Sequence, residues 1–344
     1  MMNKLYRGIS RVRQQLNYLI AKQRLIDKNN QLSKIDIDLE RLPDKLVAGM
    51  AKGLRVNKKF PAGKSIYIDV EGEELIIEVL YKFRRILDNM DNRGTSGIDI
   101  YSFCENDGYC WLDTIFPVNN YQMYVKKVVQ LTSGKNRFKL YLPSFAIIEG
   151  IYCSCGLVNV SCKNDVEIVA YGSSITQGCA ASRPGLNYLN QVANRLNCEI
   201  VNYGFSESAK GEEALLNYIS SIPTKIFIVE FDHNASIDEL QEKHQKAYMT
   251  IRRNFNGWII LLSRFSGEIS ISLEEEKKRI NIIQNTYEYA TKNGDDRIFF
   301  YNGSQLFTKN KEAFFVDKIH PNDKGMVEIA NMLCTVITEE GMLK

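Results

Sequence analysis

The chain has 344 residues with 44% hydrophobic and 25% charged side chains, a balance that excludes a disordered or fibrous protein and fits two domains. Its 44 Lys and Arg residues against 41 Asp and Glu residues give a net charge of +3, so no excess of positive charge indicates a nucleic-acid partner. No run of about 18 apolar residues predicts a membrane-spanning helix, and the first residues lack the apolar core of a signal peptide, so we expect a cytoplasmic protein.

The first 30 residues are predicted to form a basic amphipathic helical arm. Five apolar side chains recur at steps of four and three, which places them on one helix face: Leu5, Ile9, Val12, Leu16 and Leu19. Lysines and arginines occupy much of the remaining surface of residues 1–28, against the single acidic residue Asp27. Either the apolar face packs on the body or a partner subunit, or the helix lies on an anionic membrane surface.

Residues 31–160 predict a β-sandwich domain of jelly-roll type. This stretch is rich in Ile, Val, Tyr and Phe, several segments alternate in polarity, and glycine-containing turns separate them. About eight short strands at this spacing are typical of a sandwich. The expected strands are residues 35–39, 65–70, 74–83, 97–103, 109–118, 121–131, 137–143 and 146–156.

Residues 161–344 alternate strand and helix five times, which predicts an α/β domain with a parallel sheet covered on both faces. The expected strands are residues 167–171, 199–203, 225–231, 258–263 and 297–302. Helices are expected near residues 186–196, 212–220, 237–255 and 273–292, with a last one from Pro321. In such sheets, active residues collect in the loops just past the carboxyl ends of the strands.

The eight cysteines are expected to be reduced thiols in a cytoplasmic protein. Cys153, Cys155 and Cys162 lie close together, yet no CxxC pair and no histidine in ligand spacing accompanies them. We therefore interpret the cysteines as buried small hydrophobic residues and expect no metal and no cofactor.

Polar residues follow the first strand of the α/β domain and precede its last helix. The turn at residues 172–176 reads Gly-Ser-Ser-Ile-Thr and lacks the GxxxxGK[ST] and GxGxxG patterns, so it favours a serine held above the sheet over a nucleotide site. Asp317 stands three residues before His320, so its carboxylate can hold one imidazole nitrogen while the other takes a proton from a serine. The alternative for this pair is a capping arrangement.

Two further strand ends add groups that could stabilise an oxyanion. Residues 202–207 follow the second strand, and residues 231–235, which include Asn234, follow the third. An asparagine amide and backbone N–H groups are suited to a developing negative charge in acyl transfer.

Four blocks in this order resemble the SGNH (GDSL) hydrolases: GSSIT at 172–176, NYGFSES at 202–208, DHNA at 232–235 and DKIHP at 317–321. The string at 171–185 is similar to the branch with a β-sandwich before the SGNH domain. The resemblance implies a flavodoxin-like three-layer domain with a five-stranded parallel sheet. It implies that Ser174 is the nucleophile, His320 the general base and Asp317 the residue that orients it. The implied oxyanion donors are the backbone N–H groups of Ser174 and Glu207 and the side chain of Asn234.

Three positions depart from the family pattern. Ser173 stands in place of the Asp before the nucleophile, Asp232 in place of the block III Gly, and Glu207 in place of the block II Gly. A glutamate at 207 implies a backbone angle that L-residues tolerate, with its side chain turned toward solvent and toward Lys210.

Arg183 and His233 are candidates for substrate binding. Arg183 lies in the loop after the nucleophile, where the alternative is a clamp that holds the loop. His233 precedes Asn234, and its alternative role is that of the catalytic base.

These residues predict a serine esterase that hydrolyses small acyl esters. In the resembled branch the acyl group is typically acetyl, so we expect a small-molecule or saccharide ester as substrate, and no nucleic acid. The alternatives are an acyltransferase with the same triad and a non-catalytic carbohydrate-binding protein on the same fold.

Overall fold

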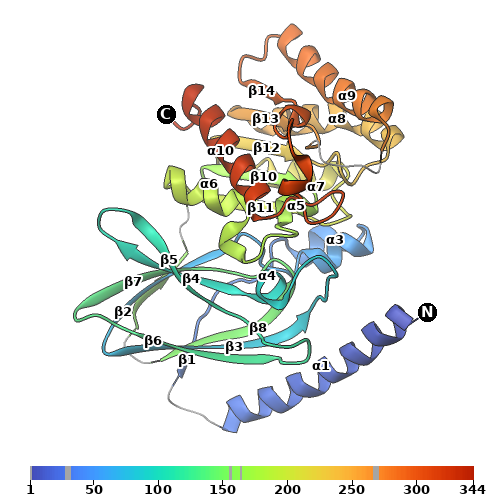
Figure 1. The fold of residues 1–344 in the computed structure, drawn as a ribbon. Coiled ribbons are helices and arrows are strands. Elements are labelled where there is room, and N and C mark those ends of the chain that lie inside the picture. Colours follow the sequence, from blue (N-terminus) through green and yellow to red (C-terminus); the bar gives the residue numbers. More distant parts are fainter. Residues whose placement is uncertain (1, 28–31, 155–156, 163–164, 266–270) are drawn as a thin grey trace. The chain divides into compact units, whose positions relative to one another are not determined.

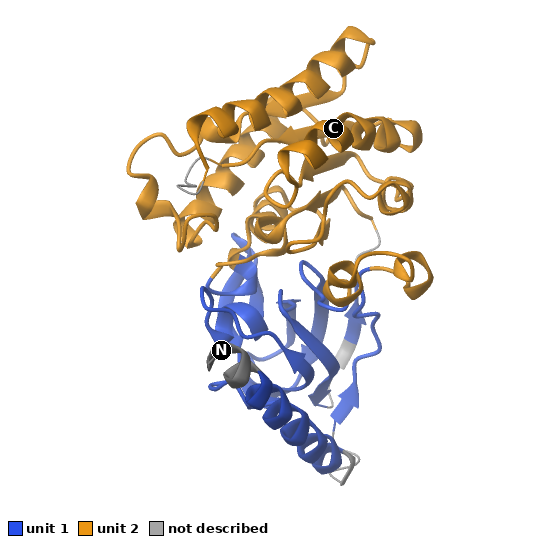
Figure 2. Ribbon diagram, turned by 90° about the vertical axis from the view of Figure 1, so that its right-hand side faces the viewer, with its two compact units in different colours: residues 1–41, 59–163, 182–185 blue, residues 42–58, 164–181, 186–344 orange. Residues whose placement is uncertain are grey.

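The computed structural model describes residues 2–27, 32–154, 157–162, 165–265 and 271–344. The chain forms two compact units, coloured separately in Figure 2. The first, here called the β unit, contains residues 1–41, 59–163 and 182–185. The second, called the α/β unit, contains residues 42–58, 164–181 and 186–344.

This division differs from the expected domain boundaries in two segments. Residues 42–58 belong to the α/β unit because Leu42, Val47 and Leu54 are buried in its core. Residues 182–185 belong to the β unit. Neither assignment can be predicted from local sequence, since both depend on contacts with distant residues.

The β unit consists of two antiparallel sheets around one core (Figure 1). One sheet has the strand order β1 (Leu32–Lys34), β8 (Ala146–Ser154), β3 (Glu74–Arg84) and β6 (Tyr124–Gln130). The other has the order β5 (Gly108–Ile115), β4 (Ile98–Cys104), β7 (Lys135–Tyr141), β2 (Ser65–Glu71) and β9 (Leu157–Ser161). Alternate residues of β2, namely Ile66, Ile68 and Val70, are fully buried, as expected for a strand with one face on the core.

Two details of the predicted strands are wrong. Residues 35–39 form no strand, and the short strand β1 lies just before them and pairs with β8. The segment expected to end near residue 156 is followed by a further strand, β9, which pairs with β2 in the other sheet. A short helix, α4 (Asn92–Ser96), also interrupts the strands.

The N-terminal helix α1 (Met2–Asp27) lies along β3 of the β unit (Figure 1). The expectation that its leucine face packs on the body is wrong. Ile9, Val12, Leu16 and Leu19 are exposed, and the opposite face of the helix makes the contacts.

The α/β unit confirms the predicted parallel sheet of five strands. Its order is β11 (Ile200–Gly204), β10 (Ile168–Gly172), β12 (Ile226–Glu230), β13 (Trp258–Leu262) and β14 (Ile298–Tyr301). Ile168 and Ala170 face one core and Val169 and Tyr171 face the other, so both faces of the sheet are buried.

Helices cover each face of this sheet. One face is covered by α6 (Tyr188–Leu196) and α10 (Asp323–Glu339). The other is covered by α7 (Glu213–Ile219), α8 (Ile237–Asn254) and α9 (Leu273–Lys292), together with residues from α2 (Asp44–Val47) and α3 (Lys52–Asn57). Helix α10 begins two residues later than expected, because the side chain of Asn322, rather than Pro321, marks its start by accepting the Gly325 N–H.

Within the described residues, no helix has both the length and the apolar character needed to cross a membrane. Nor does that part of the chain contain a group of three side chains able to hold a metal ion. Cys153, Cys179 and Cys198 are buried, as expected. The same expectation is wrong for the half-buried Cys104, Cys110 and Cys334 and for the exposed Cys162. Cys155 lies outside the described residues.

Candidate active site

A tight turn at the carboxyl end of β10 presents Ser174. The Ser173 hydroxyl accepts the Ile175 N–H (3.1 Å) and so caps the four-residue helix α5 (Ser174–Gln177). Gly172 is required before it, because a Cβ there would lie 2.2 Å from the Thr176 hydroxyl oxygen. Ser174 is thereby held at the first position of α5, where a backbone N–H has no acceptor within the helix.

Ser174, His320 and Asp317 form a continuous hydrogen-bonded chain. The Ser174 Oγ lies 2.9 Å from His320 Nε2, and His320 Nδ1 lies 2.8 Å from Asp317 Oδ2. The second carboxylate oxygen of Asp317 accepts the backbone N–H groups of Ile319 (2.8 Å) and His320 (2.7 Å). Since a carboxylate accepts at Nδ1, the proton of the neutral imidazole sits there, and Nε2 is left to accept from the serine.

A buried carboxylate supports this turn from the neighbouring strand. Glu230 ends β12 directly beside Gly172, and its Oε2 accepts the Ser173 N–H (3.1 Å), the Ser173 hydroxyl (2.8 Å) and the Thr176 hydroxyl (2.7 Å). Burial raises the pKa of Glu230 to about 7, against the effect of these hydrogen bonds.

The role of Glu230 was not predicted from the sequence. The available signals were an acidic residue at the end of the apolar strand IFIVE and the serine at 173, directly before Ser174. Glu230 thus supplies a buried carboxylate to the turn that holds Ser174.

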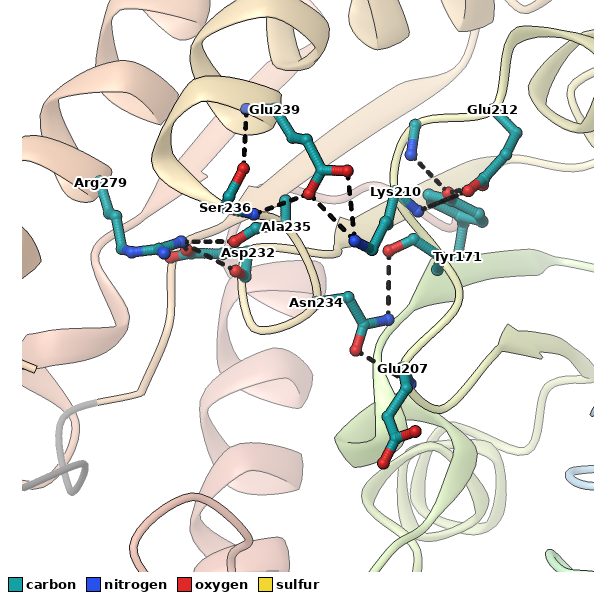
Figure 3. Close-up of polar contacts among 12 residues, drawn as sticks. Tyr171, Glu207, Lys210, Glu212, Asp232, Asn234, Ala235, Ser236, Glu239 and Arg279 are labelled. Atoms are coloured by element: carbon teal, nitrogen blue, oxygen red, sulfur yellow. Dashed lines mark hydrogen bonds and ion pairs between the residues drawn. The ribbon is translucent and has the colours of Figure 1, made fainter. Parts of the chain in front are cut away.

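Asn234 and Glu207 lie together, but each of these two expected oxyanion donors already has an acceptor (Figure 3). The Glu207 N–H donates to Asn234 Oδ1 (3.1 Å). The Asn234 amide nitrogen donates to the carbonyls of Phe205 (3.0 Å) and Ala209 (3.1 Å). The opposite amide orientation would set an oxygen against two carbonyls, so the network determines it. Asn234 therefore joins the loop after β12 to the turn after β11.

The backbone of Glu207 contradicts the expectation from sequence. Its φ is +57°, in the left-handed region that favours glycine, where an L-residue costs about 1–3 kcal/mol. Its side chain is exposed, as expected, but Lys210 pairs with Glu239 (3.0 Å) and not with Glu207. The turn thus keeps a conformation suited to glycine although a glutamate occupies it, and Asn57 holds it through the Ser206 carbonyl (2.8 Å).

Asp232 is fully buried and holds the loop after β12 (Figure 3). Its carboxylate lies 3.1 Å from the Arg279 guanidinium, which also donates to the Ala235 carbonyl (2.9 Å). The other carboxylate oxygen accepts the Arg264 N–H (2.9 Å). The departure at 232 therefore adds a buried ion pair that shapes the segment carrying His233 and Asn234.

The charge of His320 acts on the imidazole ring of His233. Burial and the positive charges of Arg264, His320 and Arg279 hold its pKa well below the usual value, so the ring is neutral near pH 7. Its Nε2 is buried and lacks a hydrogen-bond partner among the residues that the structure describes. The nitrogen that contacts Ser174 belongs to His320, which leaves His233 with substrate binding as its candidate role.

Arg183 is engaged within the β unit. Its guanidinium lies 2.7 Å from the carboxylate of the fully buried Asp99, 3.0 Å from the Tyr101 hydroxyl and 4.6 Å from the centre of the Trp111 ring. The same Asp99 oxygen accepts the Gly185 N–H (2.7 Å). These contacts favour the loop-clamp interpretation over direct substrate binding.

Two family models match the chain. The GDSL-like lipase/acylhydrolase family matches residues 165–338, and a model named GxDLY, described as the N-terminus of SGNH-hydrolase-type esterases, matches residues 16–154. The chain reads Gly97-Ile98-Asp99-Ile100-Tyr101, which fits that name except for Ile at its fourth position. Asp99 and Tyr101 are the two residues of this motif that bind Arg183.

Solved structures show the same fold at low identity. A protein described as a GDSL-like lipase from Bacteroides ovatus is 20% identical, with a TM-score of 0.79 over 90% of this chain and 97% of that one. The salicylyl-acyltransferase SsfX3 from a tetracycline biosynthetic pathway is 13% identical, with a TM-score of 0.72 over 90% and 93%. No curated protein matches. On the family match, which covers half of its length, the chain belongs to the GDSL-like lipase/acylhydrolase family.

Proposed function

We propose that the protein is a serine esterase that hydrolyses small acyl esters, with acetyl as the expected acyl group and a carbohydrate or related metabolite as the alcohol. The observation that carries this proposal is the hydrogen-bonded chain from Ser174 through His320 to Asp317. If Asp317 and His320 served only to cap a helix, His320 Nε2 would not need to contact the Ser174 hydroxyl at the end of β10.

The geometry supports a two-step acyl transfer. Ser174 Oγ attacks the ester carbonyl carbon while His320 Nε2 takes its proton, and Asp317 stabilises the imidazolium that forms. Collapse of the tetrahedral intermediate breaks the bond to the alcohol oxygen, which receives the proton from His320. Water then attacks the acyl-serine, again with His320 as base, and releases the acid.

The oxyanion is proposed to bind the Ser174 N–H, with the Glu207 N–H as a second donor when the substrate oxygen replaces the Asn234 oxygen as its acceptor. Asn234 keeps its own amide hydrogens on two backbone carbonyls and so acts mainly by holding the Glu207 turn. The buried Nε2 of His233 is proposed to hydrogen-bond the substrate.

A second candidate is an acyltransferase, in which a hydroxyl compound replaces water in the second step. The similarity over 90% of the chain to a protein named as a salicylyl-acyltransferase favours including it. Both candidates share the acyl-serine and differ only in the acceptor. A non-catalytic carbohydrate-binding protein would form no acyl-serine.

The test is hydrolysis of p-nitrophenyl acetate combined with labelling by a fluorophosphonate. Ser174→Ala and His320→Ala should each lose on the order of 10³-fold or more in turnover, and the double variant should be little worse than either. Ser221→Ala, at an exposed serine of the same unit, is the matched control. Mass spectrometry should find the label on Ser174, and product analysis with added sugar alcohols separates hydrolysis from transfer. Full turnover by Ser174→Ala would refute the proposal.

A further inference from the structure

Helix α1 packs on the β unit through one face and leaves an apolar face exposed. The face on the β unit combines apolar contacts with hydrogen bonds. Tyr18 is buried in the core of the β unit, and Ala21 and Leu25 pack against that core. Gln14 donates to the Asn120 carbonyl (2.9 Å), and Asn17 donates to the Tyr121 carbonyl (2.7 Å). Gln14 also accepts the buried Arg84 N–H (3.3 Å). A surface helix normally turns its apolar stripe to the core. Here the helix packs through this mixed face and leaves an apolar stripe on its other face exposed.

The opposite face carries an exposed apolar stripe. Its members and their exposed fractions are Ile9 (47%), Val12 (71%), Leu16 (58%), Leu19 (54%) and Ile20 (45%). At 1.5 Å per residue they form a ridge about 16 Å long. Contiguous exposed apolar surface of this kind marks a binding surface rather than an ordinary solvated face.

Positive charge borders this stripe on both sides. At 100° per residue, the exposed Arg13 and Arg24 lie about 20° and 40° beyond Ile20 on one flank, and the exposed Arg11 lies about 80° beyond Leu19 on the other. Arg13 also lies over the Tyr121 ring, 5.0 Å from its centre. Residues 8–25 contain no acidic residue. The facing carboxylate of Glu149 is already paired with Lys22 (3.0 Å), which therefore is not counted among the flanking charges.

A groove runs along the Arg24 flank of the helix. It has a volume of about 820 Å³ and is lined by α1 and by the segment before β6, including Asn17, Arg24, Asn119 and Gln122. The Arg24 guanidinium can donate hydrogen bonds to a phosphate group beside the stripe, whereas Asn17 and Gln122 already donate to the Tyr121 and Tyr124 carbonyls.

We propose that α1 docks the protein on an anionic lipid surface, with the apolar stripe inserted at the boundary of the acyl chains and the three arginines on lipid phosphates. An apolar face flanked by Arg is the pattern of helices that lie in the membrane interface. A second copy of this chain fits the surface poorly, because residues 8–25 of its α1 would bring the same arginines and no carboxylate to pair with them. The proposal is independent of the triad, so Ser174→Ala protein should bind equally well.

The test is co-sedimentation of the full chain with phosphatidylcholine vesicles, with and without phosphatidylglycerol. We expect binding only with phosphatidylglycerol at low ionic strength, and its loss at high salt. Val12→Gln/Leu16→Gln removes apolar area without a change in charge and should lower the affinity about tenfold or more. Arg11→Gln/Arg13→Gln/Arg24→Gln should lower it roughly 100-fold.

Matched controls separate these effects from misfolding and from net charge. Leu273→Gln alters an equally exposed leucine of α9, and Lys246→Gln/Lys277→Gln/Lys292→Gln removes three exposed positive charges of α8 and α9. Both controls should bind like the unchanged protein, and every variant should keep its circular dichroism. Failure of the full chain to bind phosphatidylglycerol vesicles, or unchanged binding by both α1 variants, overturns the proposal. Light scattering that shows a dimer which Leu16→Gln dissociates would assign the stripe to a subunit interface instead.

Discussion

Substitution of Glu230 by glutamine should change how the stability of the α/β unit depends on pH. The pKa of Glu230 rises from an ordinary 4.5 to about 7 because the side chain is fully buried. In the unfolded chain the carboxyl loses its proton near pH 4.5, whereas the folded protein keeps it until about pH 7. The stabilising contribution is therefore complete below pH 4.5 and is lost as pH rises through 7.

A difference of about 2.5 pH units corresponds to about 3 kcal/mol of unfolding free energy. Glutamine has the same shape and can accept the same hydrogen bonds from Ser173 and Thr176, but it does not titrate. The stability of Glu230→Gln relative to the unchanged protein should therefore increase by about 3 kcal/mol between pH 4.5 and pH 8. Other titrating groups contribute equally to both proteins and cancel.

Urea unfolding should be followed by Trp258 fluorescence in a Trp111→Phe background, so that the signal reports the α/β unit. Glu239→Gln is the control, since hydrogen bonds from the Ser236 N–H and Lys210 lower the pKa of that carboxyl. Its effect on the pH dependence should have the opposite sign. A stability difference between Glu230→Gln and the unchanged protein that stays constant from pH 4.5 to pH 8 would refute the reasoning.

Three further outcomes follow from the site. Asp317→Asn should lower kcat by about 10³–10⁴-fold in p-nitrophenyl acetate hydrolysis, because the imidazole loses the acceptor that fixes its tautomer; an unchanged kcat would contradict that role. Glu207→Gly should raise the unfolding free energy by about 1 kcal/mol in urea by relieving its positive φ, whereas Glu207→Ala should not. Arg183→Ala should destabilise the β unit by about 3–5 kcal/mol in Trp111-monitored unfolding, because it leaves Asp99 buried and unpaired. A changed KM with unchanged stability would instead make Arg183 a substrate-binding residue.

The sequence by itself determined the order of the architecture and selected the three residues that we propose as a triad. Periodicity of two and then of three to four residues separated a β-rich part from an α/β part, because side-chain spacing is a local property of strands and helices. The five parallel strands lie within two residues of their predicted positions. Ser174, Asp317 and His320 could be paired because each belongs to a short motif at the end of an element.

Only the tertiary structure decided which of these residues have partners. Periodicity identified one apolar face of α1, but contacts with residues outside α1 determined which face packs: Tyr18 enters the core of the β unit, and Gln14 bonds Asn120 and Arg84. The positive φ of Glu207 and the orientation of Asn234 depend on each other across two loops. Glu230 contacts the turn at Ser173 because β12 pairs with β10, although the two residues are more than 50 positions apart in the sequence. All of these depend on contacts between segments distant in the chain, which no local pattern records.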